Sequence, residues 1–469
     1  MTLRRAKIVC TIGPASDSEE LIEKLALAGM DCARLNFSHG NHEGHAKVAA
    51  RVRAVAAKVR RPLAILADLC GPKMRIGRFT EGSIELEVGQ RFTLTSRSVE
   101  GNREIVSMSY EPLAREVKPG DHILLDDGLL ALRVESTTAQ DVVCIVEVGG
   151  TLSNNKGMNI PGSKLSTPAL TAKDKKDLEF AVHELGVDYL ALSFVRSAED
   201  VREAQELAGR TPIIAKIEKP EAVEALNAIL DAADGVMIAR GDLGVEVGAE
   251  KVPLIQKRII REANERGKVV ITATQMLDSM IRNPRPTRAE AADVANAILD
   301  GTDAVMLSAE SASGRYPIES VSMMSAIIHE VEASWLADPH HHASHSQQIQ
   351  DWGFSTAAAQ GAALFSFVLP LKALVDFTHD GRSAVILSKH RPKAPVIAVT
   401  DDHRVASRLA LYWGVVPRLE IPPEDLAETL RLSTALLVRE NICKPGDDFA
   451  MVVGWPLSGS TNTVKLHRL

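Results

Sequence analysis

The sequence has few of the features that mark secreted, membrane or nucleic-acid-binding proteins. Its 469 residues contain five cysteines without a CxxC pair, an odd and scattered set typical of reduced thiols rather than a disulfide framework. No window approaches ~18 continuous apolar residues, so we expect no membrane span. The amino-terminal MTLRRAKIVC has two arginines but no long apolar segment after them, and is a poor signal peptide. These absences predict a cytoplasmic protein.

Charge of one sign is not in large excess. The formal net charge of −7 argues against general nucleic-acid binding, although a local basic pocket stays compatible with it. Hydrophobic residues make up 45% and charged residues 25%, which is ordinary for a globular protein and argues against disorder. The length is enough for about two to four domains.

Short apolar runs alternate with amphipathic segments such as SEELIEKLALAG and DVREAQELAG. Runs that are apolar on both faces and alternate with helices indicate a parallel sheet. Eight such runs predict an α/β fold of the (β/α)8 TIM barrel type. The runs are KIVCTIG (7–13), CARLNFS (32–38), LAILADL (63–69), YLALSF (189–194), IIAKIE (213–218), GVMIAR (235–240), VVITAT (269–274) and AVMLSA (304–309).

Two further domains are expected beside the barrel. After the third run, residues 72–167 alternate in β fashion between glycine-containing turns and predict an inserted, β-barrel-like lid domain. The barrel itself is expected at 1–71 and 168–338, and an open α/β domain at 346–469. The histidine run at 340–345 lies at the polar junction before that domain, and reads as a solvated linker more readily than as a metal site.

Polar residues gather where the predicted barrel strands end. In a barrel these carboxyl ends surround the active site, and several unpaired charges in one cavity cost too much to be explained by stability alone. The side chains expected there are Arg34, Asn36, Ser38, His39, Asp68, Arg196, Lys216, Glu218, Arg240, Asp242, Thr274 and Glu310.

The stretch IIAKIEKP places Lys216 and Glu218 two positions apart, on one face of an extended chain. Glu218 and Asp242 follow adjacent strands, so two carboxylates face one point, which suits Mg2+, or Mn2+ in its place. The alternative is that each carboxylate only forms an ion pair, with Lys216 or Arg240.

Positive charge for phosphate comes from four side chains, and the glycines of ARGDLG let backbone N–H groups approach an anion. Carboxylate-held metal together with phosphate-binding cations is the equipment of phosphoryl transfer. The four cations are Arg34, Arg75, Lys173 and Lys216.

The chain resembles the pyruvate kinase family over nearly its whole length. The matching segments include KIVCTIGPAS, ARLNFSHG, ADLCGPKMRIG, KGMNIPG, IAKIEKPEAV, DGVMIARGDLGVEVGAEKVPLIQK, ITATQMLDSM and PRPTRAEAADVANAILDGTDAVMLSAESASGRYP. The resemblance implies transfer of phosphate from phosphoenolpyruvate to ADP, giving pyruvate and ATP in glycolysis. It also implies a homotetramer. Thr287 and Glu290 in PTRAE in addition fit a capping box before a helix closed by Gly301.

The resemblance also implies roles for single residues. Lys216 matches the lysine that stabilises the transferring phosphoryl group, and Glu218 and Asp242 match the Mg2+ ligands. The N–H groups of Gly241 and Asp242 match the contacts to the substrate carboxylate, and Thr274 matches the residue beside the carbon that gains a proton. The remaining matches are Arg34 for phosphate, Asn36, His39, Arg75 and Lys173 for the nucleotide, and Asn36, Ser38, Asp68 and the Leu69 carbonyl for a monovalent cation such as K+.

Two departures from the family pattern lead to specific predictions. Lys73 stands where K+-requiring members usually carry glutamate. We therefore expect the Lys73 ammonium to take the place of K+. The alternative is that the Lys73 side chain points to water and K+ binds. In FTHDGRSA, Thr378 and Ser383 match an effector phosphate loop, but Asp380 replaces a hydroxyl residue. A carboxylate there repels phosphate, and predicts little activation by fructose 1,6-bisphosphate. A helix-capping role for Asp380 predicts the same.

Two other functions compete with this reading. A Mg2+-dependent barrel aldolase or lyase acting on pyruvate enolate would also use paired carboxylates, but has no use for Lys216, Arg75 and Lys173 as phosphate-side cations. A non-enzymatic regulatory relative would be expected to lose the lysine or a metal ligand, and all are present.

Overall fold

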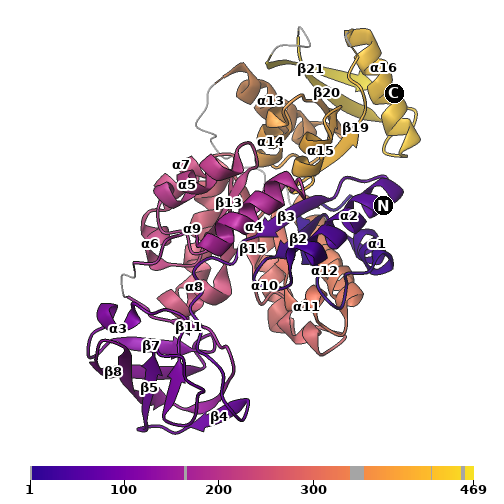
Figure 1. Ribbon diagram of the computed structural model, residues 1–469. Coiled ribbons are helices and arrows are strands. Elements are labelled where there is room, and N and C mark those ends of the chain that lie inside the picture. Colours follow the sequence, from indigo (N-terminus) through magenta and orange to yellow (C-terminus); the bar gives the residue numbers. More distant parts are fainter. Residues whose placement is uncertain (1–2, 163–165, 338–352, 424, 456–459) are drawn as a thin grey trace.

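The computed structural model describes residues 3–162, 166–337, 353–423, 425–455 and 460–469 (Figure 1). Within these residues eight parallel strands close into a barrel in the order β1-β16-β15-β14-β13-β12-β3-β2, which confirms the predicted architecture. Their bounds are β1 (Lys7–Thr11), β2 (Cys32–Asn36), β3 (Ala64–Asp68), β12 (Tyr189–Leu192), β13 (Ile213–Ile217), β14 (Gly235–Ala239), β15 (Val269–Ala273) and β16 (Ala304–Leu307). All are fully buried, apart from the last residue of β2.

Helices surround the barrel, and several of them begin at a residue whose side chain caps the helix. Thr287 Oγ1 accepts a hydrogen bond from the Glu290 N–H, and the Glu290 side chain reaches back to the Thr287 N–H, so the expected capping box is confirmed. Gly301 follows this helix with a φ of +97°, a conformation that glycine adopts readily. The helices are α1 (Glu19–Ala28), α2 (His42–Lys58), α4 (Ala172–His183), α5 (Ala198–Ala208), α6 (Pro220–Glu224), α7 (Leu226–Ala232), α8 (Arg240–Val247), α9 (Val252–Glu265), η1 (Asp278–Ile281), α10 (Arg288–Leu299), α11 (Ala309–Ala312) and α12 (Pro317–Ala337).

The inserted lid has its own hydrophobic core, drawn from residues between Met74 and Ile160. Its strands form a six-stranded sheet, β11-β7-β8-β9-β5-β6, and a two-stranded sheet, β10-β4, where the sequence predicted a barrel-like domain. One turn of helix, α3, accompanies them. The elements are β4 (Ser83–Leu86), β5 (Arg91–Thr95), β6 (Ile105–Ser107), α3 (Leu113–Glu116), β7 (His122–Leu125), β8 (Leu130–Thr137), β9 (Asp141–Val148), β10 (Gly150–Ser153) and β11 (Met158–Asn159).

The C-terminal domain is an open α/β domain, as predicted. Its sheet has the order β19-β18-β17-β20-β21, with β21 antiparallel to β20 and the other pairs parallel. The histidine run lies outside the described residues. The elements are α13 (Phe354–Val368), β17 (Leu374–Phe377), α14 (Arg382–Lys389), β18 (Val396–Thr400), α15 (His403–Leu409), β19 (Val415–Leu419), α16 (Leu426–Arg439), β20 (Asp448–Gly454) and β21 (Thr461–Arg468).

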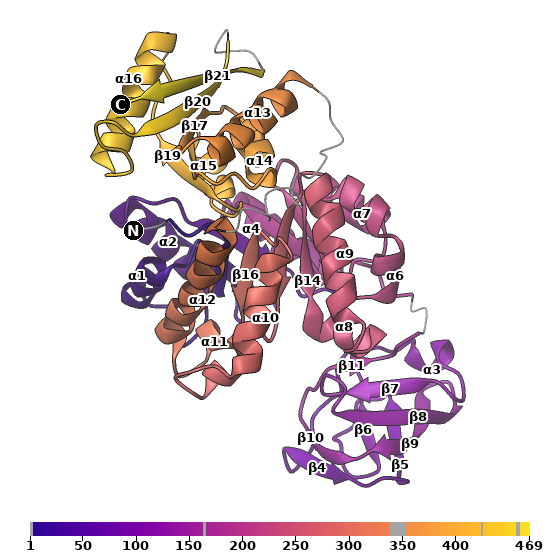
Figure 2. The ribbon, with the colours of Figure 1, turned by 180° about the vertical axis from the view of Figure 1, so that it is seen from behind.

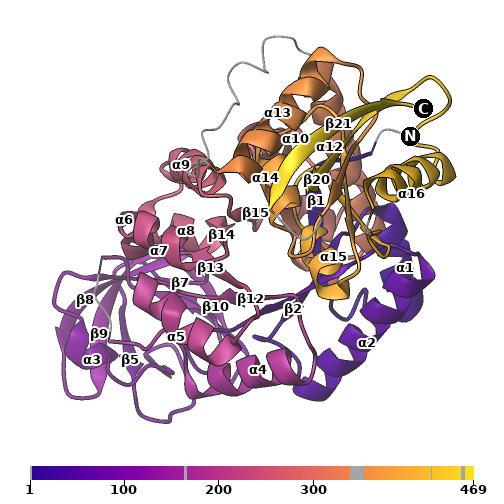
Figure 3. The same ribbon diagram turned by 90° about the horizontal axis from the view of Figure 1, so that it is seen from above.

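The barrel separates the other two domains. Figures 1 and 2 show the lid at one end of the molecule and the C-terminal domain at the other. Seen from above in Figure 3, these two domains project on different sides of the barrel. Among the described helices, none is both long and apolar enough to cross a membrane.

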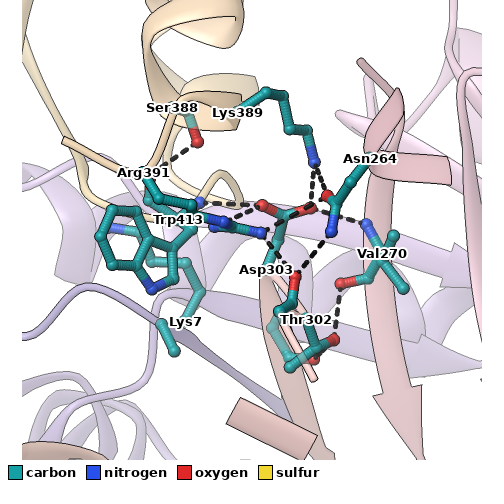
Figure 4. Close-up of polar contacts among 12 residues, drawn as sticks. Lys7, Asn264, Val270, Thr302, Asp303, Ser388, Lys389, Arg391 and Trp413 are labelled. Atoms are coloured by element: carbon teal, nitrogen blue, oxygen red, sulfur yellow. Dashed lines mark hydrogen bonds and ion pairs between the residues drawn. The ribbon is translucent and has the colours of Figure 1, made fainter. Parts of the chain in front are cut away.

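A buried ion cluster joins the base of the barrel to the C-terminal domain (Figure 4). The carboxylate of Asp303, just before β16, lies 2.5 Å from Nζ of Lys389, the last residue of α14, and 3.2 Å from Nη1 of Arg391, two residues further on. Lys389 Nζ also donates to Asn264 Oδ1 at 2.9 Å. Burial lowers the pKa of Lys389 to about 8, against the opposing effect of the Asp303 carboxylate. The cluster lies at the strand starts, opposite the mouth of the barrel.

Candidate active site

Lys216 is the centre of a charged cluster at the mouth of the barrel. Its Nζ lies 3.0 Å from Glu218 Oε1, 3.2 Å from Asp68 Oδ1 and 2.7 Å from Ser193 Oγ. Burial alone would lower the pKa of Lys216, but the Asp68 and Glu218 carboxylates outweigh it and raise the pKa above its ordinary value. The side chain is therefore a fixed cation at physiological pH.

Asp68 is held by a second cation as well. Arg34 Nε lies 2.7 Å from Asp68 Oδ2, and Arg34 Nη1 donates to Thr11 Oγ1 at 2.9 Å. Burial would raise the pKa of Asp68, but Lys216 and Arg34 together lower it. Asp68, which the resemblance assigns to a monovalent-cation site, is thus already neutralised by protein cations.

Glu218 is buried and only half satisfied. Its Oε2 accepts the Phe194 N–H at 2.7 Å, whereas its Oε1 faces Lys216 without hydrogen-bond geometry. Burial raises the pKa of Glu218 against the lowering effect of Lys216, and the nearby Asp242 carboxylate adds to the rise. A divalent cation would supply the direct partner that this oxygen lacks. The residues present therefore fit a metal ion.

Asp242 lies in the first turn of α8 and is paired with Lys73, whose Nζ is 3.3 Å from Asp242 Oδ1. Arg240, the alternative ion-pair partner considered from the sequence, instead forms two 2.7 Å contacts with Asp293 on α10. The pairing of Asp242 with Arg240 is therefore wrong, since Asp242 pairs with Lys73, whereas Glu218 does lie beside Lys216 as that alternative expected. The described residues contain no group of three or more His, Cys, Asp or Glu arranged as metal ligands, and a Mg2+ site of two carboxylates completed by substrate oxygens and water needs none.

Thr274 follows β15 in a strained backbone conformation with a φ of +67°. Its Oγ1 accepts the Gly241 N–H at 2.7 Å and donates to the Ala273 carbonyl at 2.7 Å. The hydroxyl therefore occupies the N–H that the resemblance assigns to a substrate carboxylate. A group that bound this N–H would have to displace the Thr274 hydroxyl.

The residues expected to bind the nucleotide include two cations that donate to backbone carbonyls outside the Lys216 cluster. Arg75 Nη1 donates to the Asn155 carbonyl at 3.0 Å, and Lys173 Nζ to the Phe37 carbonyl at 2.8 Å. Burial lowers the pKa of His39, and the charges of Arg75, Arg34 and Lys73 lower it further. These three positive charges therefore act together around His39, whereas Lys173 is paired with Asp177.

Asn36 and Ser38 form a local turn, in which Asn36 Oδ1 accepts the Ser38 N–H at 3.1 Å. Glu310, also expected at the mouth, accepts the Leu277 and Ser308 N–H groups at 3.2 and 2.7 Å and so holds the segments that follow β15 and β16 together.

Sequence reasoning missed Ser193, which bridges Lys216 and the Leu69 carbonyl. Its signal was available, because Ser193 is a hydroxyl residue next to the end of the predicted run YLALSF.

A parallel barrel with ionised side chains at the carboxyl ends of its strands defines the class of barrel enzymes. Two family models match the chain, "Pyruvate kinase, barrel domain" over residues 3–321 and "Pyruvate kinase, alpha/beta domain" over 356–467. The chain belongs to the pyruvate kinase family. Its activity is accordingly that of a phosphotransferase, and the aldolase or lyase alternative is not favoured.

Similar proteins from several bacteria support this membership. The chain is 46% identical to pyruvate kinase 2 of Synechocystis sp. over 474 residues, covering 99% of this chain and 79% of that protein. It is 46% identical to the pyruvate kinase of Geobacillus stearothermophilus, with 99% and 80% covered. It is 45% identical to the pyruvate kinase of Mycobacterium tuberculosis, with 99% and 98% covered.

Proposed function

We propose that the mouth of the barrel carries out phosphoryl transfer from phosphoenolpyruvate to ADP, with Lys216 as the cation on the transferring group. The observation that carries this proposal is the pairing of the Lys216 ammonium with an incompletely satisfied Glu218 carboxylate, 3.0 Å away. A cation held in a buried site stabilises charge as it develops, because it does not have to reorient.

Glu218 and Asp242 would hold Mg2+, or Mn2+ in its place, when substrate is bound. The metal supplies charge neutralisation for the oxygens of the substrate. The protein would orient the substrate carboxylate through the N–H groups of Gly241 and Asp242. The Thr274 hydroxyl, released from Gly241, would then lie beside the carbon that receives a proton.

On the nucleotide side we propose Arg75, Lys173, Asn36 and His39 as contacts to ADP and ATP, and Arg34 as a contact to phosphate. The shared lowering of the His39 pKa by Arg75 and Arg34 supports a common anion-binding region. The domain division 1–71 with 168–338, 72–167 and 346–469, a homotetramer, and a cytoplasmic location belong to the same proposal.

A coupled assay of pyruvate formation tests the function. We expect turnover of phosphoenolpyruvate only when both ADP and Mg2+ are present. Turnover without ADP would contradict phosphoryl transfer and favour the lyase. Glu218→Gln and Asp242→Asn should each raise the half-saturating Mg2+ concentration, whereas Glu224→Ala, which removes an exposed carboxylate nearby on α6, should leave it unchanged.

A further inference from the structure

The two chain segments that join the barrel to the lid run side by side. The Met158 N–H donates to the Met74 carbonyl at 3.0 Å, and the Ile76 N–H to the Lys156 carbonyl at 3.0 Å. Arg75 and Gly157 form an antiparallel bridge between these two bonds. The lid is therefore attached through a short two-stranded ribbon, which we call the hinge ribbon (residues 72–76 and 156–159).

One face of α8 contacts both strands of the hinge ribbon. Asp242 pairs with Lys73 of the outgoing strand at 3.3 Å, and Glu246 Oε1 accepts Asn159 Nδ2 of the returning strand at 2.8 Å. Residues four apart lie on the same face of a helix, so Asp242 and Glu246 present a continuous acidic edge to the ribbon.

Glu246 has a second partner within the barrel. Lys219 Nζ lies 2.5 Å from the same Oε1 atom, and Lys219 directly follows Glu218. The side chain of Glu246 is 2% exposed and that of Lys219 is 14% exposed. A carboxylate this deeply buried keeps its charge at low cost only while both donors stay in place.

We propose that Glu246 is a positioning residue whose one buried carboxylate fixes both the lid and the two metal-binding carboxylates. It ties the returning strand of the hinge ribbon to the helix carrying Asp242 and to the residue next to Glu218. The inference rests on the proposed roles of Asp242 and Glu218 as metal ligands. Loss of Glu246 leaves Lys219 unpaired and Asn159 without its acceptor. The lid and the two metal-binding carboxylates are then no longer held in a fixed position relative to each other.

Titration calorimetry with Mn2+ alone, without substrates, tests the effect on the metal site. Removing a group that orients metal ligands typically costs roughly 10–100-fold in affinity. We expect Glu246→Ala to raise the Mn2+ dissociation constant by about tenfold, and the matched Glu224→Ala to leave it unchanged. An unchanged constant in folded Glu246→Ala overturns the inference, provided that Asp242→Asn weakens binding. If Asp242→Asn binds Mn2+ normally, the proposed metal site is wrong instead.

Hydrogen exchange of the metal-free protein tests the hinge independently of the metal site. The Ile76 and Met158 amides, which close the ribbon, should exchange several-fold faster in Glu246→Ala than in Glu224→Ala. Equal exchange rates overturn the inference even if Mn2+ binding changes. Should Glu246→Ala fail to fold, Asn159→Ala removes only the contact to the lid. It should still speed exchange of both amides, and normal exchange in that variant counts against the proposal.

Discussion

The ammonium of Lys73 lies 3.3 Å from Oδ1 of Asp242, so the segment leaving the barrel for the lid meets the first turn of α8 through an ion pair. The Lys73 side chain is 26% exposed, and this contact directs its ammonium toward Asp242 rather than only toward water. Its charge also reaches His39, whose pKa it helps to lower. Lys73 thus lies between the proposed metal ligand and the proposed nucleotide side.

This position bears on the requirement for K+. We expect the initial rate in potassium-free buffer to be close to that with saturating KCl at matched ionic strength. If K+ bound about 4 Å from the Lys73 ammonium, the two charges would repel by ~4 kcal/mol at an effective dielectric of about 20. Lys73→Glu should create a K+ requirement, because it exchanges a cation for an anion. A large stimulation of the parent enzyme by K+ would show that Lys73 does not replace the ion.

Lys216→Ala should lower turnover by roughly 10²–10³, the usual effect of removing one group that stabilises transition-state charge. The structure adds an expectation about stability. Asp68 and Glu218 would be left buried beside the missing cation, and breaking such a pair costs about 3–5 kcal/mol. Turnover per folded molecule, with folding followed by circular dichroism, separates the two effects. Near-normal turnover would remove Lys216 from the mechanism.

Fructose 1,6-bisphosphate should not lower the half-saturating phosphoenolpyruvate concentration. Asp380 Oδ1 accepts the Arg382 N–H at 2.9 Å, which satisfies a helix-start donor that a phosphate would otherwise take. Thr378 and Ser383 are engaged as well, with Gly381 and Asp376. Initial rates with and without the effector measure this. The variant Asp380→Ser should be measured beside the parent. If fructose 1,6-bisphosphate activates this variant, the Asp380 carboxylate is what prevents activation of the parent.

Asp376 should make the stability of the C-terminal domain depend on pH. Burial raises its pKa to about 7, and neighbouring Asp380 contributes to the rise although Ser383 opposes it. The folded state then holds a proton that the unfolded chain has lost, so this contribution is complete below about pH 4 and disappears as the pH rises through about 7.

The measurement is the free energy of unfolding of the parent and of Asp376→Asn at pH 5 and pH 8. Relative to the parent, the variant should gain about 2–3 kcal/mol between these two values, since each pKa unit corresponds to about 1.4 kcal/mol. Parallel pH profiles would mean that Asp376 titrates normally in the folded protein.

The sequence predicted every barrel strand because burial on both faces requires continuous apolar runs, a pattern that is visible without the structure. It did not predict where the strands end. Phe194 and Thr274, included in the predicted runs, have φ values of +57° and +67° and lie beyond β12 and β15. Such conformations depend on surrounding contacts, such as the hydrogen bond from the Phe194 N–H to Glu218. The pattern of hydrophobic residues does not reveal them.

The gathering of polar side chains at the mouth also followed from the sequence, because parallel strands bring their carboxyl ends to one edge. The pairing among them did not. Arg240 forms its ion pair with Asp293, 53 residues away on α10, and not with Asp242, two residues along the chain. That choice depends on the distance and orientation of helices, which a single sequence does not specify.

The ion cluster between the barrel and the C-terminal domain has a consequence for synthesis of the chain. Asp303 lies just before the last barrel strand, yet its partner Lys389 is made 86 residues later. Lys7 in the first strand likewise donates to the carbonyl of Val415, which emerges later still. A barrel that closes on the ribosome therefore carries an uncompensated acid and an unmatched lysine at its base until the final domain arrives. Docking of the C-terminal domain, rather than closure of the barrel, is therefore the step that provides partners for these two charges.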